Sequence, residues 1–109
     1  MNGYDILTLS ARLIGIERLD EGIKMMGLSL LNATLDDMGF MPLSSLSEDT
    51  GLPTPTDRQT LIFGTSMLLA NALGDSDGRE AMGELYSRRA ATKKGGVRSL
   101  RDVMPKGEW

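Results

Sequence analysis

The chain has 109 residues, among them 12 Lys or Arg, 15 Asp or Glu and no Cys or His, so its formal net charge is −3. This length predicts a single domain with a modest core, and the missing thiol and imidazole groups exclude disulfide frameworks and most zinc and hydrolase chemistry. No apolar run approaches the roughly 18 to 20 residues of a membrane span, and no basic segment followed by an apolar run opens the chain as a signal peptide would.

Two helical patterns open the chain, over residues 5–14 and 20–38. Apolar residues of the first recur at steps of three and four, which places them on one helical face, and Gly15 is suited to end that helix in the left-handed conformation. Asp20 is placed to cap the second helix, and Gly39 to end it. The apolar face of this second helix is formed by Ile23, Met26, Leu30, Leu31, Thr34, Leu35 and Met38.

Residues 40–56, FMPLSSLSEDTGLPTPT, form a long connection with three prolines and no sustained period. Connections of this length are uncommon in compact domains. The segment is therefore either a functional loop or a stretch that becomes ordered only against a partner. Directly after it, Thr56-Asp57-Arg58-Gln59 predicts a capping box in which Thr56 begins the next helix.

The third predicted helix covers residues 57–73, and its wide apolar arc predicts that it is the central helix. Gly27 in the second helix and Gly64 in the third each cost roughly 1 kcal/mol of helix stability relative to Ala. Close helix–helix packing would compensate for this cost, so we expect these two glycine faces to pack against each other.

A fourth helix is predicted to begin with Asp77 as its cap and to end near Gly95-Gly96. Its inner stripe is formed by Met82, Leu85, Tyr86 and Arg89. The fold class is thus all-α: a small bundle of about four helices with a long Pro/Ser/Thr loop and an extended basic C-terminal tail. We divide the chain into a helical domain, residues 1–96, and a C-terminal docking tail, residues 97–109.

Charge is unevenly distributed along the chain. Residues 1–57 carry three basic and nine acidic groups, whereas residues 58–109 carry nine basic and six acidic groups. From residue 88 to the end of the chain, the basic groups are Arg88, Arg89, Lys93, Lys94, Arg98, Arg101 and Lys106. They could contact phosphate or an acidic protein surface. They could equally be a solvated helix end and terminus, because cations suit the negative end of a helix dipole.

Residues suggestive of chemistry have simpler explanations. Asp75, Asp77, Gly78 and Glu84 match part of a calcium-loop pattern, but Leu73 stands where its first acidic ligand belongs, so helix capping explains them better. The adjacent Asp36 and Asp37 point to different sides of a helix, as on a solvated face. No glycine run forms a phosphate-binding motif. We therefore expect no enzymatic activity and no cofactor.

Three stretches together resemble a known family. They are Ala11-Arg12-Leu13-Ile14-Gly15-Ile16, then Leu30-Leu31-Asn32 followed by Leu35 and Met38-Gly39, and finally Leu68-Leu69-Ala70-Asn71-Ala72-Leu73. In this order, with a Pro-containing loop before the third, they resemble the head-to-tail adaptor (connector) proteins of short-tailed bacteriophages over about residues 5–90. The chain departs from the family where Met38 replaces a frequent aromatic residue, and it is short for a long C-terminal extension.

The resemblance implies a structural virion protein that is made in the host cytoplasm and resides in the head–tail neck. Such adaptors form a homo-oligomeric ring, generally of twelve copies, beneath the portal protein, where they close the DNA exit channel and dock tail or nozzle proteins. Their C-terminal segment reaches along the portal, which gives portal-binding roles to Arg98, Leu100, Arg101, Val103, Met104 and Trp109. The resemblance also makes four basic residues candidates for contact with DNA in the channel or with an acidic surface: Arg88, Arg89, Lys93 and Lys94.

Other functions stay open from the sequence. A small nucleic-acid-binding regulator would use the segment from Arg88 to Arg101 and would bind with a steep salt dependence. The net negative charge and the lack of a helix-turn-helix signature count against it. A connector of long-tailed phages would share the helical adaptor role. An enzyme with a carboxylate-based site is the least supported alternative.

Overall fold

The computed structural model describes residues 1–93, with side chains up to Ala90. Within this range the chain forms four helices, α1 (Gly3–Leu13), α2 (Glu21–Met38), α3 (Pro55–Leu73) and α4 (Ser76–Lys93). The described residues contain no strand, and their one isolated β-bridge joins Asn2 to Asp49. The predicted all-α bundle with a long loop is confirmed. The predicted helix end near Gly95-Gly96 and the tail, residues 97–109, lie outside the described residues.

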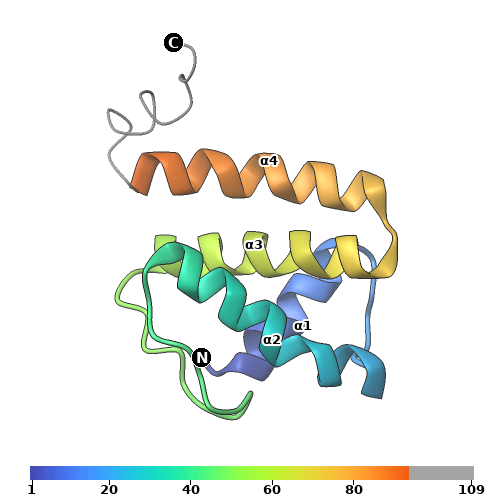
Figure 1. Cartoon of the computed structure of the whole chain (residues 1–109), viewed down its shortest axis with the longest axis horizontal. Coiled ribbons are helices and arrows are strands. Elements are labelled where there is room, and N and C mark those ends of the chain that lie inside the picture. The colour runs from blue at the N-terminus through green and yellow to red at the C-terminus, as the bar shows by residue number, and fades with distance from the viewer. Residues whose placement is uncertain (94–109) are drawn as a thin grey trace.

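Helix α3 is the centre of the bundle, as its apolar arc predicts. Helix α4 runs antiparallel along one side of it, and α1 and α2 cover the other side (Figure 1). Because α3 has neighbours on both sides, residues all around it are buried, including Leu61, Leu69 and Ala70. The fully buried large apolar side chains are Ile6, Leu7, Leu31, Leu35, Leu61 and Leu69.

Several helix ends follow the predicted chemistry. The Asp20 carboxylate caps α2 by accepting a hydrogen bond from the Ile23 amide at 2.8 Å. Gly39 ends α2 with φ +87°, and Gly15 follows α1 with φ +88°. Helix α1 begins earlier than its apolar spacing indicates, because Asn2 forms a reciprocal capping box with Asp5.

Two predicted helix caps are wrong. Helix α3 begins at Pro55, and its cap is Thr54, whose hydroxyl accepts from the Asp57 amide at 3.0 Å, not Thr56. Proline suits the first position of a helix since its missing N–H would have no partner there, so the helix extends two residues further back. Helix α4 begins at Ser76, and the Asp75 carboxylate, not that of Asp77, accepts from the Gly78 amide at 3.0 Å.

The predicted close helix packing at two glycines is present, but the glycines do not face each other. A Cβ added to Gly27 would collide with the Leu7 side chain of α1. A Cβ added to Gly64 would lie 2.5 Å from Cγ2 of Thr34 in α2 and 2.7 Å from the Tyr86 ring in α4. Gly27 therefore brings α1 to α2, and Gly64 lets α2 and α4 both approach α3.

The long loop between α2 and α3 packs against its own bundle. Leu43, Leu46 and Leu52 are buried, at 7 to 9% exposed. The Asn32 side chain donates to the Leu43 carbonyl at 2.9 Å and accepts from the Leu43 amide at 2.8 Å. Further along, the Leu46 carbonyl accepts from the Tyr4 amide at 2.9 Å. The loop therefore packs on its own bundle, and it covers the start of α1.

Candidate interaction surfaces

The basic end of α4 is only partly described. Arg88 forms an ion pair with Glu84 one turn earlier, at 2.8 Å, and the Arg89 guanidinium lies 5.3 Å from the centre of the Phe63 ring. Both arginines are therefore engaged within α4 or with α3. Lys93 belongs to α4, but its side chain lies outside the described part, as does all of Lys94.

The candidate portal-binding residues all lie outside the described residues: Arg98, Leu100, Arg101, Val103, Met104 and Trp109. The chain enters this segment from the C-terminal end of α4, which lies at the end of the bundle opposite the turn between α3 and α4 (Figure 1).

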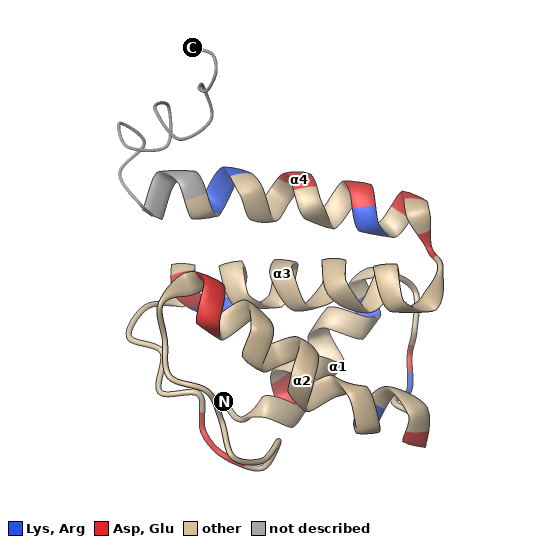
Figure 2. Ribbon diagram, in the orientation of Figure 1, with Lys and Arg blue, Asp and Glu red and all other residues tan. Residues whose placement is uncertain are grey.

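Helix α4 carries its charges in order along its length. Acidic residues gather in its first turns and basic ones towards its end, with Arg79 as the exception (Figure 2). This order matches the helix dipole, which favours anions at the N-terminus and cations at the C-terminus. One stripe of α4 faces α3, with Tyr86 buried and Met82 and Leu85 half-buried. The charge gradient therefore belongs to a largely solvated helix.

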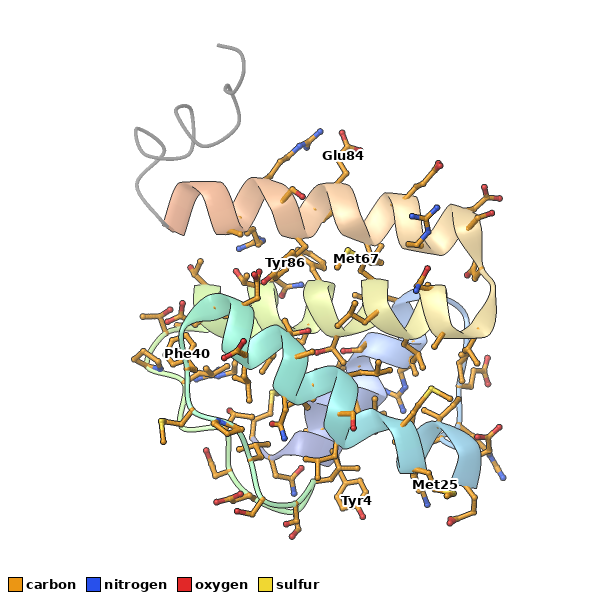
Figure 3. All side chains as sticks on the ribbon, in the orientation of Figure 1. Tyr4, Met25, Phe40, Met67, Glu84 and Tyr86 are labelled. Atoms are coloured by element: carbon orange, nitrogen blue, oxygen red, sulfur yellow. The ribbon has the colours of Figure 1, made fainter. Side chains whose placement is uncertain are left out.

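Tyr86 joins α4 to α2. Its ring packs at Gly64, and its hydroxyl donates to the Asp37 carboxylate at the end of α2 (Figure 3). Burial of the phenol, followed by its bond to Asp37 and the charge of that carboxylate, raises the pKa of Tyr86 well above its usual value. Asp37 therefore has a structural role, because its carboxylate accepts the hydrogen bond of a buried phenol.

A concavity of about 520 Å³ opens where α1 ends and the chain turns into α2. It is lined by Arg12, Gly15, Glu17 and Arg18. The sequence analysis did not identify it, because these residues, at the end of α1 and in the short connection after it, show no spacing typical of a binding site, although the positive φ of Gly15 marks the turn that shapes it.

A second, smaller concavity of about 220 Å³ lies at the turn between α3 and α4. Its lining includes Gly74, Asp75 and Arg79. A Cβ added to Gly78 would lie 3.1 Å from Cγ2 of Ile14, so the start of α4 and the end of α1 are in close contact. The two concavities therefore lie at the same end of the bundle.

Two methionines are largely exposed to solvent. Met25 near the start of α2 is 81% exposed, and Met41 after its end is 83% exposed. Leu13 and Leu73, at the ends of α1 and α3, are about half exposed. Apolar side chains are thus present on the surface at both ends of α2.

The described residues contain neither a cluster of metal ligands nor a membrane-spanning helix. Across residues 1–93, no three acidic side chains gather closely enough to hold a metal ion. The partial calcium-loop pattern is explained at Asp75 by its bond to the Gly78 amide. No helix in the described range is long and apolar enough to cross a membrane.

Comparison of the chain with known protein families, with curated proteins and with solved structures finds no match.

Proposed function

We propose that this chain is a head-to-tail adaptor, a structural protein of a tailed bacteriophage that forms a ring beneath the portal, closes the DNA exit channel and docks tail components. In this proposal the bundle is the ring-forming body, and residues 97–109 are the segment that binds the portal. The protein would be made in the host cytoplasm and end in the head–tail neck of the virion.

The observation that carries the proposal is the sequence resemblance. Each of its three stretches contains residues that shape or stabilise the same four-helix unit. Ala11 is buried and Gly15 turns the chain after α1. Asn32 fastens the long loop through two hydrogen bonds to Leu43. Leu69 in the third stretch is fully buried in the central helix. Residues with such roles are the ones that a shared fold would retain.

The charge distribution is a second support. The body, residues 1–93, has eight basic and thirteen acidic residues, while residues 94–109 have four basic and two acidic ones. A basic segment with spaced apolar side chains, attached to an acidic body, suits docking into grooves of a partner with acidic surface.

The test is native mass spectrometry of the portal ring encoded by the same genome, alone and after mixing with this protein. A discrete mass gain close to twelve protomers, each of 11.8 kDa, is expected. The gain should disappear with a variant that ends at Gly96. No gain at any mixing ratio would overturn the proposal.

Two controls make that test specific. The variant ending at Gly96 must give the circular dichroism spectrum of a helical bundle, so that lost binding reports the missing segment and not unfolding. A second variant, Arg98→Ala with Arg101→Ala, keeps the length of the segment and should weaken binding less than the truncation does. If the variant ending at Gly96 binds as well as the full chain, the portal-binding role of residues 97–109 is wrong.

A further inference from the structure

The concavity at the end of α1 presents two arginines without an ion-pair partner in the described part of the chain. Arg12 and Arg18 are both exposed, and neither forms a salt bridge there. Glu17 lines the same concavity, so the three charged side chains that line it, two arginines and one glutamate, carry a net charge of +1. Exposed Leu13 follows Arg12 directly. This surface, defined by Arg12, Leu13, Glu17 and Arg18, is called the arginine concavity below.

The C-terminal end of α2 presents the complementary features. Asp36 and Asp37 lie in the last turn, where the helix dipole is also negative, and that turn has no basic residue. Neither carboxylate forms an ion pair within residues 1–93, although Asp37 accepts from Tyr86. Met41 follows two residues after Gly39 and is 83% exposed. This surface, defined by Asp36, Asp37 and Met41, is called the aspartate end below.

These two surfaces cannot meet within one chain. They lie at opposite ends of the bundle, since α2 begins beside the arginine concavity and ends at the start of the long loop (Figures 1 and 3). With 18 residues, α2 separates them by about 27 Å. Two carboxylates at the negative end of a helix are unfavourable by themselves, and a pair of guanidinium groups would relieve this cost.

We propose that the arginine concavity of one copy of this chain receives the aspartate end of the next copy. Asp36 and Asp37 contact Arg12 and Arg18, and Met41 packs against Leu13. Because the two surfaces differ and lie at opposite ends, the contact is head-to-tail, and repetition closes a ring or extends a filament. This contact would build the ring of the proposed adaptor, and to that extent the inference rests on the proposed function. The contact between copies can be tested by itself.

A charge-reversal series tests the contact by sedimentation equilibrium. Arg18→Glu places an acidic residue opposite the aspartate end, and Asp36→Lys places a basic residue opposite the arginine concavity. Each change should weaken self-association by at least about tenfold, because like charges then face each other. The double variant, Arg18→Glu with Asp36→Lys, should recover association by exchanging the two charges.

Disulfide cross-linking between introduced cysteines detects the same contact when association is weak. The chain has no Cys of its own to interfere. An equimolar mixture of Arg18→Cys and Asp36→Cys variants should give a disulfide-linked heterodimer under mild oxidation. The control pair replaces Asp36→Cys with Ser87→Cys, at an exposed position of α4. A single chain carrying both Arg18→Cys and Asp36→Cys should give rings or ladders.

The outcomes separate this contact from the adaptor function. Cross-linking no better than in the control pair, both free and with the portal ring present, would overturn the contact even if the portal is bound. Failure of the double variant to recover association, or a closed dimer as the only product, would also overturn it. A specific cross-link without portal binding would keep the contact and remove the adaptor function.

Discussion

At Gly64 of α3, side chains from α2 and α4 both approach the backbone closely. An added Cβ would lie 2.5 Å from Thr34 Cγ2 and within 2.8 Å of two Tyr86 ring atoms. Forcing a methyl group into such a packed site costs about 1–3 kcal/mol, while the helix propensity of Ala returns only about 1 kcal/mol. We expect Gly64→Ala to lower the free energy of unfolding, measured with urea, by up to about 2 kcal/mol.

Gly22 supplies the matched control in the first turn of α2. It is exposed, and an added Cβ would meet only a carboxylate oxygen of Asp20 at 3.4 Å, an ordinary contact distance. Gly22→Ala should leave the free energy of unfolding unchanged or raise it by up to roughly 1 kcal/mol. If both glycine variants unfold at the same urea concentration, the packing explanation for Gly64 is wrong.

Tyr86 makes stability depend on pH in the alkaline range. Its pKa in the folded chain is raised above the ordinary value of 10.0, first by burial and then by the bond to Asp37. The stability linked to this phenol is therefore fully present below about pH 10 and is lost as the pH rises further, because the unfolded chain releases the proton more readily. The loss should approach about 1.4 kcal/mol per pH unit.

The Tyr86→Phe variant isolates this effect because it keeps the ring and removes the hydroxyl. At neutral pH it should be less stable by about 1–2 kcal/mol, for the lost bond to a carboxylate. Urea unfolding from about pH 8 to about pH 11 should show the difference between the two proteins shrinking above pH 10. Parallel curves across this range would contradict the assignment.

The start of α3 shows how a helix end depends on more than one residue type. Both Thr54 and Thr56 can cap a helix, and Thr56 has the better local pattern because Gln59 stands three residues on. Pro55 decides between them, since its fixed φ already suits the first helical position. The Thr54 hydroxyl then accepts from the Asp57 amide.

Removal of one hydroxyl at a time tests this assignment. Thr54→Ala should lower the free energy of unfolding by about 1 kcal/mol, as for other lost N-caps. Thr56→Ala should have little effect, because Thr56 is exposed and the bond from Thr60 goes to its backbone carbonyl. The two variants carry the same substitution at sites two residues apart, so urea unfolding compares them directly. Equal loss in both would restore Thr56 as the cap.

The helices were predictable from sequence, but their partners were not. Apolar spacing and the glycines at 15 and 39 mark where the helices lie because these signals are local. Close packing occurs at both Gly27 and Gly64, but the two glycines do not face each other. Gly27 faces Leu7 of α1 and not α3, whereas Gly64 faces Thr34 of α2, the expected helix, and also Tyr86 of α4. A pattern along one helix identifies its buried face, whereas the neighbour on that face depends on the path of the loops.

The surfaces were less predictable than the bundle for the same reason. The arginine concavity is lined by Arg12, Gly15, Glu17 and Arg18, and its shape depends on how the chain turns after α1, which no periodic spacing of these residues indicates. Asp37 reads as a solvated residue because its partner, Tyr86, is 49 positions away. The basic residues of α4 were visible in the sequence, but the engagement of Arg89 with Phe63 was not.

The core of the described residues is formed by the four helices and the loop between α2 and α3. Every buried apolar residue in the described part of the chain lies at or before Tyr86. Removal of residues 97–109 therefore leaves each described core contact in place. The variant ending at Gly96 should unfold within about 0.5 kcal/mol of the full chain, as expected for changes away from a core.

The variant ending at Gly96 can therefore distinguish an effect of residues 97–109 on stability from an effect on portal binding. If residues 97–109 act only on a partner, truncation at Gly96 removes portal binding while the urea midpoint of the body stays the same. Because the truncation also removes three basic and two acidic groups, both proteins should be measured at low and at high salt, so that screening reveals any purely electrostatic effect on the body. A loss of stability well above 0.5 kcal/mol at both salt concentrations would show that the segment packs on its own bundle, and its apolar side chains would then not be free to enter grooves of a portal.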